Sequence, residues 1–379
     1  MTPRRLAVLV VVLATLARPA LAQRFATADS IVRSGVTRGI YPGAVLLIGR
    51  HDGVIHAEHF GHLTWRTSSP VPTPDSTLWD LASLTKVVGT MPAVLHLLAI
   101  GRLRLDAPVA QYLPRYTGSG RERVTLRMLL DHSSGLVSYL PFFTLTATRD
   151  SAIALLYRQV PRRPPGSVVE YSDLNFLLLG QIIEAVTGAS LEDNVRRTIL
   201  DPAGLAPMRY RPPAELADHT APTGQYRGTP LCCQVNDQNA VRWGGVAGHA
   251  GLFATGAALA RYARLWLNGG VLDGRQLLDS ALVRQFLTPA GPGATRLLGW
   301  ERPDPKNRDD SAYGHLLSEQ AYGHTGWTGT LIWIDPARDL FLVLLTNRSF
   351  GPKVPHSIRA LRGVRGALAD AVVREADSR

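Results

Sequence analysis

Runs typical of β-strands lie near both ends of this 379-residue chain, far apart in sequence. Near the N-terminus, residues 44–48 and 54–60 are apolar and β-prone, and Asp52-Gly53 between them is typical of a hairpin turn. Near the C-terminus, residues 330–334 and 340–345 flank a turn-forming stretch. We therefore predict an α+β fold in which N- and C-terminal strands form one antiparallel sheet flanked by helices.

The middle of the chain has the periodicity of helices. Apolar residues recur every three or four positions in runs that glycines follow: 87–98 before Gly101, 171–186 before Gly188, and 252–267 before Gly269. A short helix over residues 124–132 and an amphipathic C-terminal helix over residues 357–376 are also predicted.

These patterns divide the chain into two kinds of structure. We predict a single catalytic unit, residues 23–379, with an α/β part over about 35–80 and 290–379. A mostly helical part, over about 87–290, is inserted between those two segments. A cleft between the two parts is the expected place for a site.

The first 22 residues have the pattern of a signal peptide. Arg4 and Arg5 precede an apolar run over residues 6–17, and Ala20-Leu21-Ala22 is the small-x-small pattern of a cleavage site. The mature chain is expected to begin at Gln23, in the periplasm or outside the cell. The apolar run is too short to span a bilayer, so no stable membrane insertion is expected after its removal, although an uncleaved signal anchor is the alternative.

The chain is basic, with a formal charge of +11. Removing the signal peptide removes three arginines and no acid, which leaves +8. A basic surface attracts polyanions in general. Because the chain carries an export signal and its arginines are scattered, we expect no nucleic-acid partner; the expected partner is a small-molecule or cell-wall peptide substrate.

Neither cysteine nor histidine predicts a metal or a cofactor. Cys232 and Cys233 are adjacent, and such a pair rarely closes a disulfide and cannot complete a zinc site. His56, His59 and His62 recur every third residue, but on a hairpin the first two point to opposite sides. We expect structural cysteines, no metal site and no cofactor.

Ser83 and Lys86 form the first candidate catalytic pair. Three residues along a helix is about one turn, so the amine of Lys86 can reach the hydroxyl of Ser83. A serine nucleophile needs an adjacent base, and lysine can be that base if its surroundings lower its pKa. Lysine is rare in this chain, occurring only at 86, 306 and 353. An exposed lysine at a helix start is the alternative.

Two further segments carry candidate site residues. Tyr171-Ser172-Asp173 begins a predicted helix, where tyrosine can act as a phenolate base or relay a proton. A buried aromatic with Asp173 as the helix N-cap is the alternative, and Asp173 can serve both the cap and the site. His324-Thr325-Gly326 precedes the C-terminal strands, and on an edge strand it could bind a substrate carboxylate or carbonyl, with Gly326 allowing close approach of a ligand. A solvated turn is the alternative for His324.

Taken together, the three segments resemble the three motifs of the serine β-lactamase and penicillin-binding protein superfamily. The surrounding sequence is similar to its class C β-lactamase-related branch at four places: residues 129–136, 165–166, 176–180 and 326–330. The resemblance spans roughly residues 35–375. A weaker similarity over residues 235–253 points to relatives that act on cell-wall muropeptides, and there His249 is either at the cleft edge or packed in a glycine-rich loop.

The resemblance implies a role for each motif residue. Ser83 would form an acyl-enzyme, and Lys86 and Tyr171 would share proton transfer, without a decision between them as acylation base. The backbone N–H groups of Ser83 and Trp327 would form the oxyanion hole. Asp173, His324, Thr325 and Gly326 would contact substrate.

Two positions depart from the family pattern. Asp173 stands where asparagine is common, and an ionised aspartate only accepts hydrogen bonds. His324 stands where lysine is common; if its pKa is unshifted, its charge and its hold on a carboxylate weaken as pH rises through about 6.5. Both changes disfavour efficient β-lactam hydrolysis.

The sequence thus predicts an exported serine hydrolase that cleaves an amide or ester bond through Ser83. Peptidoglycan-derived peptides or β-lactam-like compounds are the expected substrates. One alternative is a promiscuous carboxylesterase. Another is a penicillin-binding or sensing protein that is acylated at Ser83 and deacylates slowly.

Overall fold

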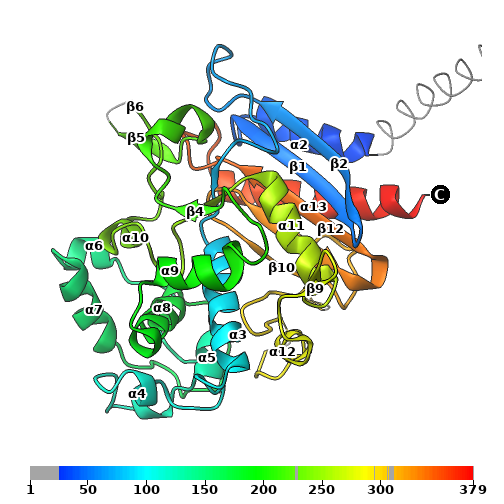
Figure 1. The fold of residues 1–379 in the computed structure, drawn as a ribbon. Coiled ribbons are helices and arrows are strands. Elements are labelled where there is room, and N and C mark those ends of the chain that lie inside the picture. The colour runs from blue at the N-terminus through cyan, green and yellow to red at the C-terminus, as the bar shows by residue number, and fades with distance from the viewer. Residues whose placement is uncertain (1–24, 227–228, 294, 305, 307–310, 379) are drawn as a thin grey trace, which may run out of the picture.

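A computed structural model describes residues 25–226, 229–293, 295–304, 306 and 311–378, so the predicted signal peptide lies outside the described residues. Its main feature is a five-stranded antiparallel sheet with the order β10-β11-β12-β1-β2 (Figure 1). The strands are β1 (Gly43–Arg50), β2 (Gly53–Gly61), β10 (Tyr322–Thr325), β11 (Leu331–Asp335) and β12 (Leu340–Thr346). N- and C-terminal strands therefore share one antiparallel sheet, which confirms the predicted fold class.

The sheet is covered by helices on both faces because its inner strands β1, β11 and β12 are buried on both sides. Ala44, Leu46 and Ile48 of β1 pack with α2 (Ala26–Thr37) and α13 (Ser357–Asp377). The alternate residues, Val45 and Leu47, belong to the larger core that includes α11 (Gly256–Leu267). Each buried side chain of this size contributes roughly 1.5–3 kcal/mol. Helix α2 was not predicted from the sequence.

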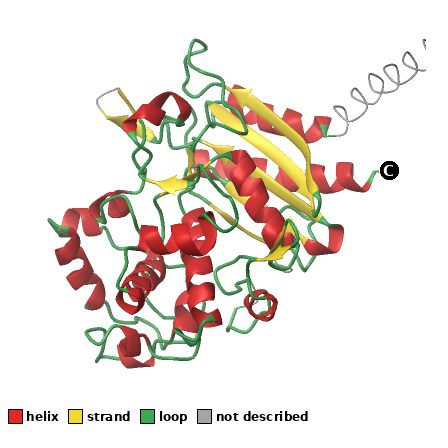
Figure 2. Ribbon diagram, in the orientation of Figure 1, coloured by secondary structure: helices red, strands yellow, loops and turns green. Residues whose placement is uncertain are grey.

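The other helices gather beside the sheet (Figures 1 and 2). They are η2 (Lys86–Thr90), α3 (Met91–Ala99), α4 (Val109–Tyr112), η3 (Arg121–Arg123), α5 (Leu126–Leu130), α6 (Phe142–Leu145), α7 (Arg149–Tyr157), α8 (Asp173–Thr187), α9 (Leu191–Val195), η4 (Arg196–Leu200), η5 (Ala214–His219), α10 (Gln238–Arg242) and α12 (Ser280–Phe286), with η6 (Pro336–Arg338) between β11 and β12. Gly188 ends α8 in the left-handed conformation, as its position after the apolar run predicts.

Short strands connect the middle of the chain to the segment before Ser83. A small sheet has the order β3-β7-β4, formed by Trp79–Asp80, Leu252–Ala254 and Arg209–Tyr210. Two hairpins are β5 (Gly224–Tyr226) with β6 (Thr229–Leu231), and β8 (Val271–Leu272) with β9 (Arg275–Gln276).

The helix predicted from residue 252 begins at Gly256 instead. Leu252 accepts a hydrogen bond from the Leu81 amide and donates its own amide to Thr85 Oγ1, at 2.9 and 3.1 Å. Thr255 then caps α11 by accepting from the Ala258 amide. Pairing with the chain around Ser83 thus outweighs the helical periodicity of these first residues.

Candidate active site

Ser83 lies where strand β3 turns into a helix. Ala82, directly before it, has a φ of 46°, a backbone conformation that non-glycine residues rarely adopt. The carboxylate of Asp80 holds this turn, because its Oδ1 accepts from the Ala82 amide at 2.9 Å and its Oδ2 from the Asn236 amide at 2.7 Å. Strained backbone of this kind is characteristic of functional positions.

Lys86 is fully buried behind Ser83, within the π-helical turn η2. Its Nζ lies 3.0 Å from Ser83 Oγ, 2.7 Å from Asp173 Oδ1 and 3.3 Å from the carbonyl oxygen of His249. An ammonium group has three N–H donors, and each has an acceptor here. The helical spacing therefore does bring Lys86 to Ser83, and the exposed-lysine alternative is wrong.

The pKa of Lys86 is raised in this environment. Burial acts to lower it, but the negative charge of Asp173 and the interaction with Tyr171 outweigh the burial. The sequence-based condition that surroundings lower this pKa is therefore not met in the resting site. Lys86 rests as an ammonium ion, and it can accept the Ser83 proton only after losing one of its own.

Tyr171 contacts the same serine from the other side. Its hydroxyl donates to Ser83 Oγ at 2.9 Å, and the ring centroid is 4.8 Å from Lys86 Nζ. Burial raises the pKa of Tyr171, which Lys86 opposes without cancelling. Ser83 Oγ thus lies between two proton donors, an ammonium and a phenol.

Asp173 occupies a different place from the one that its motif implies. It is the first residue of α8, whose N-cap is Ser172, so the prediction of Asp173 as N-cap is wrong. Its carboxylate pairs with Lys86, and it is absent from the residues that line the cavity beside Ser83. The chain therefore uses Asp173 to compensate the buried lysine charge.

His132 supports Tyr171 from behind, a role that sequence reasoning missed. Its Nδ1 accepts from the Ser172 amide and from Asn175 Nδ2, both at 3.1 Å, and its ring lies 4.7 Å from that of Tyr171. Burial holds the pKa of His132 well below the ordinary value, so the imidazole stays neutral. Its place in the motif-like segment 129–136 was the only available signal.

His324 is a buried, neutral residue of the edge strand β10. Its Nδ1 donates to the Thr325 carbonyl oxygen at 2.8 Å, and the side chain is 1% exposed. Burial lowers the pKa of His324 to about 4, since the attraction of Glu301 does not compensate it. The prediction that His324 carries partial charge near neutral pH is therefore wrong, and so is the alternative of a solvated turn.

Gly326 and Trp327 form the loop after β10. A Cβ at Gly326 would lie 2.0 Å from Thr330 Oγ1 and 2.6 Å from the Leu81 carbonyl oxygen. The close approach that this glycine permits is therefore to other parts of the protein, whereas the sequence predicts a ligand there. The Trp327 side chain is 57% exposed. Among the described residues, no acceptor is found for the backbone amides of Ser83 and Trp327. Both amides are therefore available to a ligand oxygen.

A cavity of about 320 Å³ opens onto these groups. It is lined by Ser83, Tyr171, the stretch from His324 to Trp327, Glu301, Ala312, Ile358, Arg362 and Arg365. Burial acts to raise the pKa of Glu301, but Arg296, paired with it at 2.6 Å, holds that pKa at about 2. The predicted residues from three distant segments thus meet at one cavity, with Lys86 and Asp173 behind it.

The β-lactamase family profile matches residues 28–365 of the chain, most of its length. The chain belongs to the β-lactamase family. A protein of Escherichia coli K12, provisionally named a D-alanyl-D-alanine carboxypeptidase, is 32% identical over 82% of this chain and 80% of its own length. An N-acetylmuramyl-L-alanine amidase of Bacillus subtilis is 30% identical over 86% of this chain and 81% of its own.

Solved structures show the same fold. EstCE1, a hydrolase with promiscuous acyltransferase activity, superposes with a TM-score of 0.74 at 19% identity, over 93% of this chain and all of its own. A class C β-lactamase superposes with a TM-score of 0.72 at 21% identity, over 92% of this chain and 96% of its own. The predicted superfamily is confirmed, and the protein is a hydrolase of the β-lactamase family.

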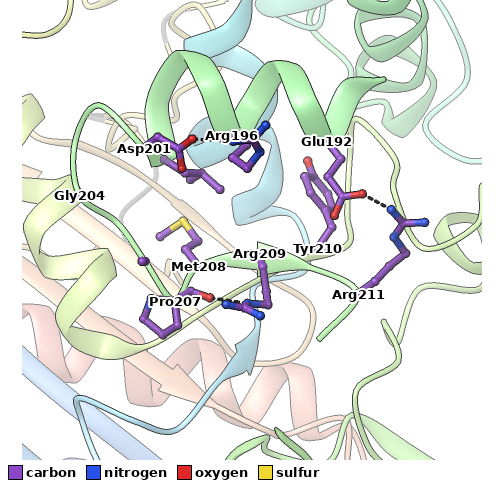
Figure 3. A pocket seen from close by; sticks show the side chains of 11 residues that line it. Glu192, Arg196, Asp201, Gly204, Pro207, Met208, Arg209, Tyr210 and Arg211 are labelled. Atoms are coloured by element: carbon purple, nitrogen blue, oxygen red, sulfur yellow. Dashed lines mark hydrogen bonds and ion pairs between the residues drawn. The ribbon is translucent and has the colours of Figure 1, made fainter. Parts of the chain in front are cut away.

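This β-lactamase-family protein has a second, larger cavity of about 540 Å³, away from Ser83 (Figure 3). It lies between η4 and β4, where Arg196 pairs with Asp201 at 2.8 Å and Arg211 pairs with Glu192. None of the predicted site residues lines it. We therefore assign the chemistry to the smaller cavity.

The remaining candidates do not line the cavity beside Ser83. His249 is buried and its Nε2 lies 3.0 Å from Asp237 Oδ1, so it is packed and not at the cleft edge. Cys232 and Cys233 are free thiols. Within the described ranges, no group of three or more His, Cys, Asp or Glu side chains could hold a metal.

Among the described residues, no single helix is long and apolar enough to cross a membrane. The bent pair formed by Asp173–Thr187 and Leu191–Leu200 passes that test by length and composition alone.

Proposed function

We propose that this protein is an exported serine hydrolase that cleaves an amide bond of peptidoglycan-derived peptides through an acyl-enzyme on Ser83. The contact of Ser83 Oγ with both Lys86 Nζ, at 3.0 Å, and Tyr171 Oη, at 2.9 Å, carries this proposal. A hydroxyl becomes a nucleophile when a neighbouring group takes its proton, and both neighbours here can exchange protons. The free amides of Ser83 and Trp327 supply the donors for an oxyanion.

The reaction begins when the Lys86–Tyr171 pair has released one proton. Ser83 Oγ attacks the substrate carbonyl carbon, and its proton passes to that pair. The tetrahedral oxyanion accepts hydrogen bonds from the two backbone amides. When the intermediate collapses, the bond to the leaving nitrogen breaks and the pair returns the proton to it; water then attacks the acyl-enzyme by the same route and releases the acid.

Since both members of the pair have raised pKa values, the reactive form is the minor one at neutral pH. Two groups in contact with one oxygen titrate as a unit, so the base belongs to the pair and not to one residue. The rate of acylation should therefore increase with pH across the neutral and mildly alkaline range.

The substrate class is supported by the two relatives whose names specify cell-wall chemistry. The carboxypeptidase and the amidase cover most of this chain at 32% and 30% identity. Such substrates exist in the periplasm or outside the cell, so the proposal requires export. Sequencing the mature N-terminus, expected at Gln23, tests export.

Intact mass spectrometry after a fluorophosphonate probe tests the nucleophile. We expect a single adduct on the wild-type chain and none on Ser83→Ala, with Ser76→Ala, an exposed serine, as the matched control. Retention of the label in Ser83→Ala would refute the assignment. Release of an acyl adduct over time separates a hydrolase from a protein that stalls after acylation.

A carboxylesterase is the second candidate, and two apolar side chains that line the cavity favour it. They are the exposed Trp327 and Ile358 of α13, while the neutral His324 supplies no charge for a peptide carboxylate. Turnover of muropeptides against p-nitrophenyl esters of increasing acyl length decides between the two. Faster hydrolysis of long-chain esters with no muropeptide turnover would favour the esterase.

A further inference from the structure

Two buried arginines lie directly behind the loop that carries Trp327. Arg348 follows β12, and Arg365 projects from α13; each is 4% exposed. Among the described residues neither forms an ion pair with a carboxylate, although the more distant Glu301 acts on the charge of Arg365. Burying a guanidinium without a paired acid is strongly unfavourable. Such a cost calls for a specific role.

Both side chains donate to backbone carbonyl groups of this loop. Arg365 Nη2 donates to the carbonyl oxygens of Gly326 and Thr330, at 2.8 Å each. Arg348 Nε donates to the Trp327 carbonyl oxygen at 2.9 Å, and Arg348 Nη2 donates to it as well. The Arg348 guanidinium also lies 4.5 Å from the centre of the Trp327 ring. The two arginines thus fix the peptide groups on both sides of Trp327.

The Gly326 carbonyl and the Trp327 amide belong to the same peptide group. In a planar trans peptide the C=O and N–H bonds point in opposite directions, so a cation held on the oxygen fixes where the N–H points. Hydrogen bonds in series also polarise one another, which makes the N–H a stronger donor. Burial lowers the pKa of Arg365 to about 9 and of Arg348 to about 10, so both remain charged at neutral pH.

We propose that Arg365 is a positioning residue for acyl transfer: it orients and polarises the peptide group whose N–H, at Trp327, stabilises the oxyanion. Arg348 completes the arrangement by holding the carbonyl and ring of Trp327. This inference rests on the proposed function of Ser83. It predicts an effect on the transition state that exceeds the effect on substrate binding.

The test compares Arg365→Gln, Arg365→Lys and Arg348→Gln with the wild-type protein. Arg359→Gln is the matched control, since this arginine is exposed on the same helix. We would measure kcat and KM for a p-nitrophenyl ester per active site titrated by fluorophosphonate, and the inhibition constant of a boronic acid that forms a tetrahedral adduct on serine. Titration removes any loss that comes only from misfolded protein.

We expect Arg365→Gln to lower kcat about 10- to 100-fold while KM changes less than about threefold, and to weaken the boronic acid in parallel with kcat. Arg365→Lys keeps the charge and should recover part of the loss; Arg348→Gln should show a smaller decrease. An unchanged kcat per titrated site, or a loss confined to KM, would overturn the proposal.

Two features of the experiment allow a negative result to be interpreted. If Arg365→Gln does not fold, Arg365→Lys and Arg348→Gln carry the same measurement, because each weakens hydrogen bonds to the loop that carries Trp327. Failure of the wild-type protein to be labelled at Ser83 would refute the proposed function. Normal labelling of wild type with unaffected arginine variants would refute only the role of the arginines.

Discussion

The two walls of the active-site cavity differ in how their charged and polar groups are arranged. On the helical wall, formed by Ser83 and Tyr171 with Lys86 and Asp173 behind them, the ionisable groups contact one another or Ser83, so charge is balanced locally. On the strand wall, His324 is neutral and the buried arginines hold backbone carbonyl groups. The first wall can therefore exchange protons, whereas the second presents fixed dipoles. Proton transfer should be sensitive to single charges, and oxyanion binding to backbone geometry.

The substitution Lys86→Arg should have the largest effect on the helical wall. The new guanidinium would keep the positive charge beside Asp173 but cannot give up a proton near neutral pH. We expect kcat/KM to fall about 10³-fold or more, a loss typical of removing a group essential to proton transfer. Steady-state kinetics with an ester substrate measure this, with Lys306→Arg at the surface as control. Retained activity would show that Lys86 acts only as a charge.

Tyr171→Phe removes the hydroxyl that donates to Ser83 Oγ and leaves the ring in place. We expect kcat to decrease about 10²-fold, because the Lys86 side chain can still relay protons less efficiently. Pre-steady-state acylation rates measure the step directly. Tyr112→Phe, whose hydroxyl accepts from the Arg104 amide, is the control. A loss confined to deacylation would place Tyr171 in the second half of the reaction.

Asp173→Asn changes the charge on the helical wall without changing its shape. The Asp173 carboxylate raises the pKa of both Lys86 and Tyr171, so its removal lowers both. The pH at which acylation reaches half its maximum should therefore shift downward. A kcat/KM profile against pH measures the shift, with Asp106→Asn, in an exposed ion pair, as control. An unmoved or upward-shifted profile would contradict the pairing.

The strand wall should give the smallest response to pH. Because burial keeps His324 neutral down to about pH 4, affinity for a carboxylate-bearing substrate should be flat between about pH 5.5 and about pH 8. Inhibition constants measured across this range test it. An affinity that falls as pH rises through about 6.5 would instead show that a charged His324 binds the carboxylate.

The same histidine should appear in the stability of the protein. Its folded pKa lies below the unfolded value of 6.5, so the unfolded chain binds more protons between about pH 6.5 and 4. The free energy of unfolding should therefore decrease as pH falls through that window. Urea unfolding of His324→Gln should show a weaker decrease than wild type, and the exposed His96→Gln should not.

Several features of the fold could be predicted because they are local. The β1–β2 hairpin follows from Asp52-Gly53 between two apolar runs, and the end of α8 follows from Gly188. Residues 252–254 could not be predicted as a strand, since their partners come from two distant segments of the chain, β3 and β4. Helix α2 was missed although it closes one face of the sheet.

The same distinction between local and long-range contacts applies to the candidate site. The amino-acid sequence determined that Ser83 and Lys86 face each other, because a helical turn fixes that spacing. Only the tertiary structure decided the charge states: Asp173 reaches Lys86 from 87 residues away, burial neutralises His324, and Arg365 reaches back 39 residues to the Gly326 carbonyl. The physical reason is that a pKa depends on desolvation and on neighbouring charges, and folding brings both from distant parts of the chain.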